Sequence, residues 1–288
     1  MAISGESFWP RVSIVFTAYN AERYIKASVS AALSQTYHNF EVIVVDDGSI
    51  DRTGEICAAI TDPRFRYLYK GRLGRSRALN VGVEHAQGDY IAINDADDLS
   101  LPHRLEYSIE FLLAHPDVAF LGTGFVETAV FQESIPQDIL VASAFSTHRG
   151  EVLWPSRLTV YRRNLFNNST LLFPKAVWRA VGGYDERLSL CEDYDFYLRA
   201  MQCGKAALLP GQTVMWYTNP DGFFKQKSLE DYLAAMAVIK LRALDVLGLP
   251  RWMRLYHPLW VKVHQTLRWY SRLRSFVWTR TADLIQKG

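Results

Sequence analysis

The sequence predicts an α/β fold in which a mostly parallel sheet is flanked by helices and followed by a C-terminal helical extension. Over about the first 100 residues, short β-branched runs alternate with segments of helical apolar spacing. Each succession of strand, helix and strand is a βαβ unit, in which the two strands are parallel and the crossover is right-handed. The 288 residues, 49% of them hydrophobic, can bury a substantial core.

The N-terminal elements are expected in strict alternation. β-branched and apolar runs predict strands at residues 12–18, 41–47, 64–70 and 89–95. Apolar residues at helical spacing predict helices at residues 21–36, 49–60 and 75–87. Ser49 is the expected N-cap of the second helix, and Gly88 closes the third. Asp98 is expected to cap a helix that begins near Leu101 and Pro102.

Polar side chains gather where three of these strands end. They lie in the segments Thr17-Ala18-Tyr19-Asn20, Asp46-Asp47-Gly48-Ser49 and Asp95-Ala96-Asp97-Asp98. Ligands of such sheets bind outside the carboxyl ends of the strands, so we expect one shared polar rim. Carboxylates packed together repel one another, and a divalent cation relieves that repulsion. Oxygen ligands favour Mg²⁺ or Mn²⁺, which can stabilise negative charge on a diphosphate.

Several common classes of protein are disfavoured. No GxGxxG follows the first strand and no GxxxxGK[ST] occurs, which argues against a dinucleotide oxidoreductase and a P-loop NTPase. The three cysteines are widely spaced and form no CxxC pair, so neither a disulfide framework nor a zinc site is indicated. The N-terminus lacks the pattern of a signal peptide, and no uncharged apolar stretch reaches about 18 residues, so we expect a cytoplasmic protein.

Three segments resemble successive landmarks of the GT-A glycosyltransferases of family 2. They are residues 12–53, which contain TAYN and VVDDGS, residues 80–98, which end in DADD, and residues 180–200, which contain GGYDE and CEDYD. The resemblance extends from residue 11 to about residue 218. It implies a Rossmann-like GT-A sheet and an inverting transfer of sugar from a nucleotide sugar, with a UDP-sugar favoured.

The resemblance implies roles on the donor side. Thr17 and Tyr19 would contact the nucleobase, and Asp47 would accept a hydrogen bond from it. The alternatives are that Tyr19 is a core aromatic residue and that Asp47 only forms the turn in DDGS. Either Arg75 or Arg77 would lie near the nucleotide, and Arg77 is the candidate carried forward. For both arginines an ordinary solvated helix face is the alternative. Asn20 would shape the turn after the first strand, a conformation that asparagine tolerates well.

The same resemblance implies a metal site. Asp95 and Asp97 match the family's DxD motif, in which the first aspartate meets the ribose or the metal and the last binds the cation, here Mn²⁺ or Mg²⁺. Many relatives place a histidine after the later ED element as a further ligand. This sequence has Asn219 at about that place, so either metal binding would be weaker or water and the diphosphate alone would complete the coordination.

On the acceptor side the resemblance implies that Asp193 is the base that deprotonates the acceptor hydroxyl, a task that suits a carboxylate. Glu192 and the pair Gly182-Gly183 would lie beside the acceptor. The alternatives are that the two acids only favour the N-terminus of a helix and that the glycines only end one.

Residues 225–288 form a second predicted part, a helical tail after the catalytic domain at residues 1–224. The last 49 residues have a net charge of +8, leaving −6 for the remainder, and Trp252, Trp260, Trp269 and Trp278 are interleaved with basic residues. This pattern favours peripheral attachment to the inner face of the plasma membrane, close to a lipid-linked acceptor. The alternatives are packing on the catalytic domain or on a second copy of the chain, giving a homo-oligomer. The acidic remainder argues against nucleic acid as a partner.

The sequence therefore predicts a non-processive, metal-dependent, inverting glycosyltransferase of the hexosyltransferase type (EC 2.4). It would add a single sugar to a glycan or lipid-linked glycan in polysaccharide or cell-surface glycan biosynthesis. QTLRW at residues 265–269 matches the QxxRW of processive synthases, and we interpret it as a chance match. The alternatives are a sugar nucleotidyltransferase, disfavoured because no glycine-rich basic loop follows the first strand, and a non-catalytic scaffold for nucleotide sugar or membrane.

Overall fold

A computed structural model describes residues 9–147, 150–220, 222, 226–250 and 252–253. Its strands are β1 (Val12–Ala18), β2 (Phe40–Asp46), β3 (Phe65–Tyr69), β4 (Tyr90–Asp95), β5 (Leu99–Ser100), β6 (Val118–Thr128), β7 (Leu172–Pro174) and β8 (Lys205–Tyr217). Its α-helices are α1 (Ile25–Leu33), α2 (Thr53–Ala58), α3 (Arg75–His85), α4 (Arg104–Ala114), α5 (Gln137–Ser146), α6 (Arg157–Arg162), α7 (Lys175–Val181), α8 (Glu192–Ala200) and α9 (Leu229–Val246). A 3₁₀ turn, η1, spans Asn168–Thr170.

The strands form one mixed sheet in the order β3-β2-β1-β4-β7-β6-β8-β5. β1 pairs in parallel with β2 and β4, and β2 pairs in parallel with β3, as expected for successive βαβ units. β7 then pairs antiparallel with both β4 and β6, while β6 and β8 are parallel. The predicted α/β fold and its four N-terminal strands are confirmed.

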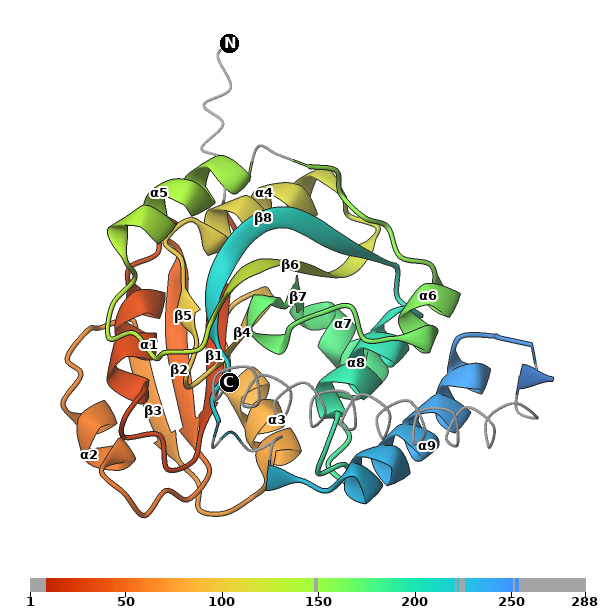
Figure 1. The fold of residues 1–288 in the computed structure, drawn as a ribbon, viewed down its shortest axis with the longest axis horizontal. Coiled ribbons are helices and arrows are strands. Elements are labelled where there is room, and N and C mark those ends of the chain that lie inside the picture. The colour runs from red at the N-terminus through yellow and green to blue at the C-terminus, as the bar shows by residue number, and fades with distance from the viewer. Residues whose placement is uncertain (1–8, 148–149, 221, 223–225, 251, 254–288) are drawn as a thin grey trace, which may run out of the picture.

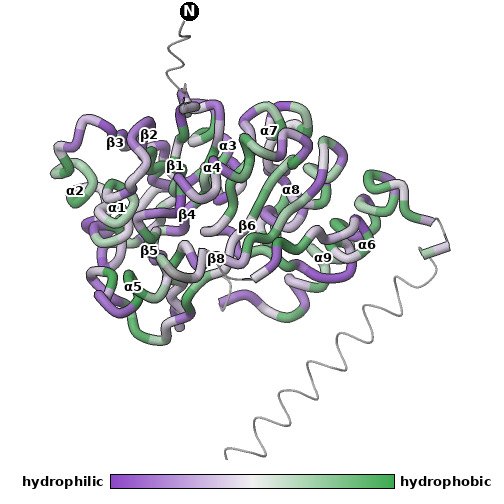
Figure 2. The backbone as a smooth tube through the Cα atoms, turned by 90° about the horizontal axis from the view of Figure 1, so that it is seen from above, coloured by the Kyte–Doolittle hydropathy of each residue, from purple (hydrophilic) through white to green (hydrophobic). Residues whose placement is uncertain are grey.

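Alternating side chains of the strands divide the core between the two faces of the sheet. Ile14 and Phe16 of β1 face a layer containing α1, α2 and α4. Val15 faces a second layer containing α3, α6, α7, α8 and α9. Because successive side chains of a strand point to opposite faces, one fully buried strand supplies both layers. Helices α1 and α2 lie at one end of the molecule and α6 and α9 at the other (Figure 1), an arrangement that the view from above repeats (Figure 2).

Two predicted caps are wrong. Helix α2 begins at Thr53, and its first turn is held by Asp51, whose Oδ1 accepts from the Thr53 backbone at 3.0 Å. The Ser49 hydroxyl instead accepts from the Asn20 backbone at 2.9 Å, joining two loops of the rim. Helix α4 begins at Arg104, and Asp98 does not cap it because its carboxylate is used in tertiary contacts.

The predicted amphipathic helix of the tail is present as α9. Its N-terminus has a capping box in which the Ser228 hydroxyl accepts from the Asp231 backbone at 3.0 Å. Its buried residues, among them Met236, Ile239 and Leu244, belong to the same core cluster as residues of α8. In the described part of the chain, no helix combines the length and apolarity required to cross a bilayer. The QTLRW segment and three of the four tryptophans of the tail lie outside the described residues.

Candidate active site at the carboxyl rim of the sheet

The sheet brings the three polar segments together as expected. In the parallel register, Thr17 of β1 lies opposite Asp95 of β4, and Ala18 lies opposite Asp46 of β2. The Asp47 backbone donates to the Ala18 carbonyl at 2.8 Å, so the loops after β1 and β2 remain joined beyond the last strand residues. Asn20 adopts a left-handed conformation with φ of 49°, consistent with its predicted role in the turn.

The two aspartates after β2 have different tasks. Asp46 caps its own turn, because its Oδ1 accepts from the Ser49 backbone at 2.8 Å and its Oδ2 from the Tyr67 hydroxyl at 2.7 Å. Asp47 organises the loop before α3 and accepts from the backbone of Leu73 at 2.6 Å and of Gly74 at 2.9 Å. A carboxylate offers about four acceptor positions, so Asp47 can still accept a hydrogen bond from a ligand.

Tyr19 and Arg72 form an exposed platform above Asp47. The Arg72 guanidinium carbon lies 3.6 Å from the centre of the Tyr19 ring, and its Nη1 donates to Asp47 Oδ2 at 2.7 Å. The Tyr19 side chain is 46% exposed although it follows a fully buried strand. Gly48 allows this arrangement, since its φ is +83° and a Cβ there would come within 2.8 Å of the Arg72 backbone. A planar, stacking surface beside a carboxylate suits a nucleobase.

The three aspartates after β4 differ in their surroundings. Asp95 Oδ1 accepts from Asn168 Nδ2 at 3.0 Å. Asp98 is almost fully buried, accepting from the Ser169 hydroxyl and from the Tyr217 backbone at 3.0 Å. Its burial and the charges of Asp95 and Asp97 raise the pKa of Asp98 well above its ordinary value. Asp98 thus joins both η1 and the end of β8 to residues 95–98, which we call the aspartate turn.

Asp97 is the partly buried middle carboxylate of this turn. Burial, and then the charge of Asp95, raise its pKa, and the hydrogen bond from Asn219 Nδ2 to Asp97 Oδ2 at 3.0 Å opposes the rise. Asn219 therefore lies beside Asp97 of the DxD match, and its relation to a metal stays a prediction.

The carboxylates of the rim meet part of what a divalent-cation site requires. In the described ranges, no group of three or more His, Cys, Asp and Glu side chains is arranged to hold a metal ion. Asp97 and Asp95 nevertheless offer carboxylate oxygens under mutual repulsion, and Mg²⁺ often takes only one or two protein carboxylates while substrate phosphates and water supply the rest. The residues fit a cation that binds together with a diphosphate.

Arg75 connects the donor side of the rim to the acceptor side. Its Nη2 donates to Asp95 Oδ1 at 2.5 Å, and its Nε donates to Glu192 Oε1 at 2.6 Å. Arg75 is the first residue of α3, Asp95 ends β4 and Glu192 begins α8, so one guanidinium joins three elements. Charge-assisted hydrogen bonds of this kind fix geometry as well as adding stability.

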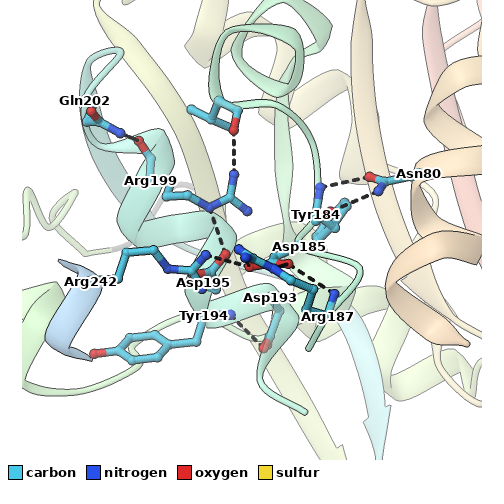
Figure 3. A network of polar contacts seen from close by, with 11 residues as sticks. Asn80, Tyr184, Asp185, Arg187, Asp193, Tyr194, Asp195, Arg199, Gln202 and Arg242 are labelled. Carbon is cyan, nitrogen blue, oxygen red and sulfur yellow. Dashed lines mark hydrogen bonds and ion pairs between the residues drawn. The ribbon is translucent and has the colours of Figure 1, made fainter. Parts of the chain in front are cut away.

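Asp193 follows Glu192 in the first turn of α8. Burial, and then the charge of Glu192, raise the pKa of Asp193 to about 7. Two interactions oppose the rise: the Tyr194 backbone donates to Asp193 Oδ1 at 2.7 Å (Figure 3), and Arg75 is nearby. The residue before the helix, Cys191, has φ of 59°, a strained conformation of the kind often found at functional sites. A carboxylate that titrates near neutral pH is suited to accept a proton.

Arg77 and the pair Gly182-Gly183, which were predicted as site residues, have other contacts in the structure. Arg77 points away and pairs with Glu84 at 2.9 Å and Glu186 at 3.1 Å. Gly182 ends α7 with φ of +75°, and Gly183 follows with φ of +73°, where a Cβ would come within 2.7 Å of Asn80 Oδ1. The glycine pair therefore ends a helix and permits close packing on α3, and its place beside the acceptor stays a prediction.

Sequence reasoning missed three contributors to the rim, Arg72, Asn168 and Ser169. The stretch that precedes α3, residues 70–74, contains a lysine, an arginine and two glycines, which was a signal for a loop that approaches a ligand. Asn168 and Ser169 come from η1, more than 70 residues after Asp95, and no local pattern indicated their contact.

Comparison with known proteins gives a consistent result. A model described as Glycosyl transferase family 2 matches residues 13–173. A putative glycosyltransferase of Bacillus subtilis, EpsE, is 30% identical over 249 residues, covering 84% of this chain and 84% of its own. An uncharacterised glycosyltransferase of Rickettsia typhi is 31% identical over 199 residues, which is 68% of this chain. The chain covers 60% of that relative's length and 58% of a Rickettsia prowazekii relative's.

Solved structures share the fold. Staphylococcus aureus TarS in complex with UDP-GlcNAc superimposes with a TM-score of 0.63 at 19% identity, covering 82% of this chain and 70% of the other. A mannosyltransferase of Pyrobaculum calidifontis in complex with GDP-Man and Mn²⁺ gives a TM-score of 0.63 at 21% identity, covering 88% and 72%. At these identities the likeness concerns the fold alone.

Proposed function

Because the chain belongs to glycosyl transferase family 2, we propose that it transfers a single sugar from a nucleotide sugar to a glycan or lipid-linked glycan. The reaction is non-processive and inverts the anomeric centre, and a UDP-sugar is the favoured donor. The observation that carries the proposal is the pair of short contacts through which Arg75 joins Asp95 to Glu192, the neighbour of Asp193. Donor and acceptor groups thereby meet within one charge network.

The donor is held by two groups of side chains. Tyr19 and Arg72 offer a stacking surface for the base, and Asp47, below them, accepts from it. Thr17 lies at the end of β1, next to Asp95. We propose that Arg75 takes the place assigned to Arg77 from the sequence, because it alone of the two reaches the aspartate turn.

Asp97, with Asp95, is proposed to hold Mn²⁺ or Mg²⁺ together with the diphosphate. When bound, the cation would neutralise the negative charge that develops on the departing nucleoside diphosphate. Burial, and then the charge of Asp95, raise the pKa of Asp97, which supports this role because a nearby cation would favour the ionised carboxylate against both effects.

Asp193 is proposed to act as general base. The acceptor oxygen attacks the anomeric carbon as the bond from that carbon to the diphosphate oxygen breaks, and the acceptor proton passes to the Asp193 carboxylate. A single displacement inverts the centre. A base with a pKa of about 7 is well matched to neutral conditions, because it combines basic strength with a substantial ionised fraction.

The test is release of nucleoside diphosphate from UDP-, GDP- and dTDP-sugars, with and without Mn²⁺ or Mg²⁺, in the presence of a panel of glycan acceptors. We expect one donor class to give metal-dependent release that Asp97→Asn abolishes. Binding of each donor is measured in the same samples. Pyrophosphate release from a nucleoside triphosphate and a sugar phosphate would instead identify a nucleotidyltransferase, and metal-dependent donor binding without turnover would identify a scaffold.

A further inference from the structure

The segment that carries the proposed base is held at both ends by a side chain from the C-terminal helix. We call residues 185–195 the base segment; it runs from Asp185 into the first turn of α8. Arg242 of α9 donates through Nη1 to Asp185 Oδ2 at 2.5 Å, and its Nη2 lies 2.8 Å from Asp195 Oδ1. Both carboxylates converge on this guanidinium in Figure 3. Asp193 lies between these two anchors in the chain.

The ion pairs of Arg242 involve carboxylates that are largely shielded from water. Asp195 is only 2% exposed, so its charge needs partners, which are Arg242 and Arg199, whose Nε donates to Asp195 Oδ2 at 2.7 Å. Asp185 is also paired with Arg187, and Arg187 and Arg242 together hold the pKa of Asp185 below its ordinary value. The Arg187 side chain is 83% exposed, so its pair is weakened by solvent in a way that the Arg242 pair is not.

Helix α9 is itself firmly placed against the sheet domain. Its apolar face is packed into the core cluster that contains Phe196 and Tyr197 of α8. Lys240, two residues before Arg242, is buried. It donates to the Tyr161 carbonyl near the end of α6, and its Nζ lies close to the Tyr194 ring. Arg242 therefore lies on a helix that packs in the same core cluster as α8, and its guanidinium joins Asp185 to Asp195.

The base segment is thus fixed from two sides. On the donor side, Arg75 holds Glu192 to Asp95. At the two ends of the segment, Arg242 binds Asp185 and Asp195. We propose that Arg242 is a positioning residue for the transfer reaction, which fixes Asp193 in the geometry that acceptor deprotonation requires, so that α9 is part of the working transferase. This inference rests on the proposed function of Asp193.

The experiment compares Arg242→Met with Arg187→Ala in the full chain, at a temperature where circular dichroism shows both folded. Arg187→Ala is the matched control because it removes another arginine from the same Asp185. We expect Arg242→Met to lower kcat by about 10- to 100-fold, since small misplacements of a reacting group cost this much, while donor affinity is unchanged. Arg187→Ala should keep kcat close to the wild-type value, and Arg242→Lys, which can pair with one carboxylate, should be intermediate.

A double-mutant cycle separates positioning from general loss of structure. If Arg242 acts through Asp193, Arg242→Met should not reduce the residual transfer of Asp193→Asn any further. An equal additional loss in the Asp193→Asn background, an equal loss in Arg187→Ala, or weakened donor binding would overturn the proposal.

Amide hydrogen exchange provides a readout that needs no acceptor. Peptides covering the base segment should exchange faster in Arg242→Met than in the wild type or in Arg187→Ala. Unchanged exchange there would contradict the anchoring. If the wild type shows no transfer with any donor, the proposed function fails, and the deprotonation role with it, while the exchange comparison still reports whether Arg242 holds the segment.

Discussion

At the scale of single residues, the Asp193 carboxylate lowers the stability of the fold when it is ionised, and the same ionised form is the proposed general base. Burial and the charge of Glu192 raise its pKa to about 7, whereas an unfolded aspartate titrates near pH 4. Between these values the folded chain binds more protons than the unfolded chain, so stability is lost as the pH rises toward 7. Ionised Asp193 therefore destabilises the fold above pH 7.

Asp193→Asn should remove this cost and the activity together. Asn keeps an oxygen for the hydrogen bond from the Tyr194 backbone but carries no charge. Thermal unfolding should show a higher Tm than the wild type at pH 8, with the difference shrinking as the pH is lowered to 5 and below. Transfer should fall by at least about 100-fold, the order of a lost general base. A variant that is no more stable at pH 8, or that transfers normally, would contradict the assignment.

The wild-type rate should show the same titration. Groups facing Asp193 are Glu192 on its own helix, Arg75, Asp95, and the buried Tyr184 and Tyr197, each of which interacts electrostatically with it. Activity should be lost as the pH falls below about 7, because the base becomes protonated. The resemblance to the family pointed to Asp95, Asp97, Asp193 and Asn219 before the structure. The electrostatic environment of Asp193 depends on residues brought together from α3, β4, α8 and the loop before α8, and it could not be predicted.

At the scale of elements, Arg75 joins the start of α3 to the end of β4 and the start of α8. The sequence could not separate Arg75 from Arg77, because both lie in the first turn of a predicted helix two residues apart. The tertiary contacts separate them, since a rotation of about 200° around the helix axis points two such residues to nearly opposite faces. Arg75 faces the rim, and Arg77 pairs with Glu84 and Glu186.

Arg75→Met should weaken donor binding and lower kcat by at least tenfold, about 1.4 kcal/mol, because a cation that pairs with Asp95 and Glu192 is lost. It should also move the acid limb of the pH–rate profile upward, since Arg75 lowers the pKa of Asp193. The matched control is Arg77→Met, whose partners are exposed and which should leave both donor affinity and kcat near wild type. The reverse ranking of the two variants would restore Arg77 as the donor residue.

Local capping rules failed at two elements for a common reason. Ser49 and Asp98 were expected as helix caps, but both serve tertiary contacts, with the Asn20 backbone and with Ser169 and Tyr217 respectively. A short polar side chain at the sheet rim has several partners available, and the sequence names only those nearby in the chain. Both errors fell at the candidate site, where local rules and function compete.

At the scale of the whole molecule, the sequence predicted the first half of the sheet and not the second. The βαβ units of residues 12–95 are local and periodic, so their pattern specifies their order and hand. Strands β5 to β8 pair antiparallel or across long separations, and the register of β6 with β8 shifts at three places. Such pairing depends on contacts that have no sequence period. The boundary proposed between residues 224 and 225 and the membrane contact of the tail stay predictions.

The central claim is that one rim performs two separable tasks, donor binding through Asp97 and acceptor deprotonation through Asp193. The most direct measurement is calorimetric titration of the nucleotide sugar, with and without Mn²⁺, into wild type, Asp97→Asn and Asp193→Asn, alongside the transfer rate of each. We predict that Asp97→Asn loses metal-dependent donor binding and transfer together, whereas Asp193→Asn keeps the donor binding and loses the transfer. Metal-dependent binding that survives in Asp97→Asn, or transfer that survives in Asp193→Asn, would contradict this account of the site.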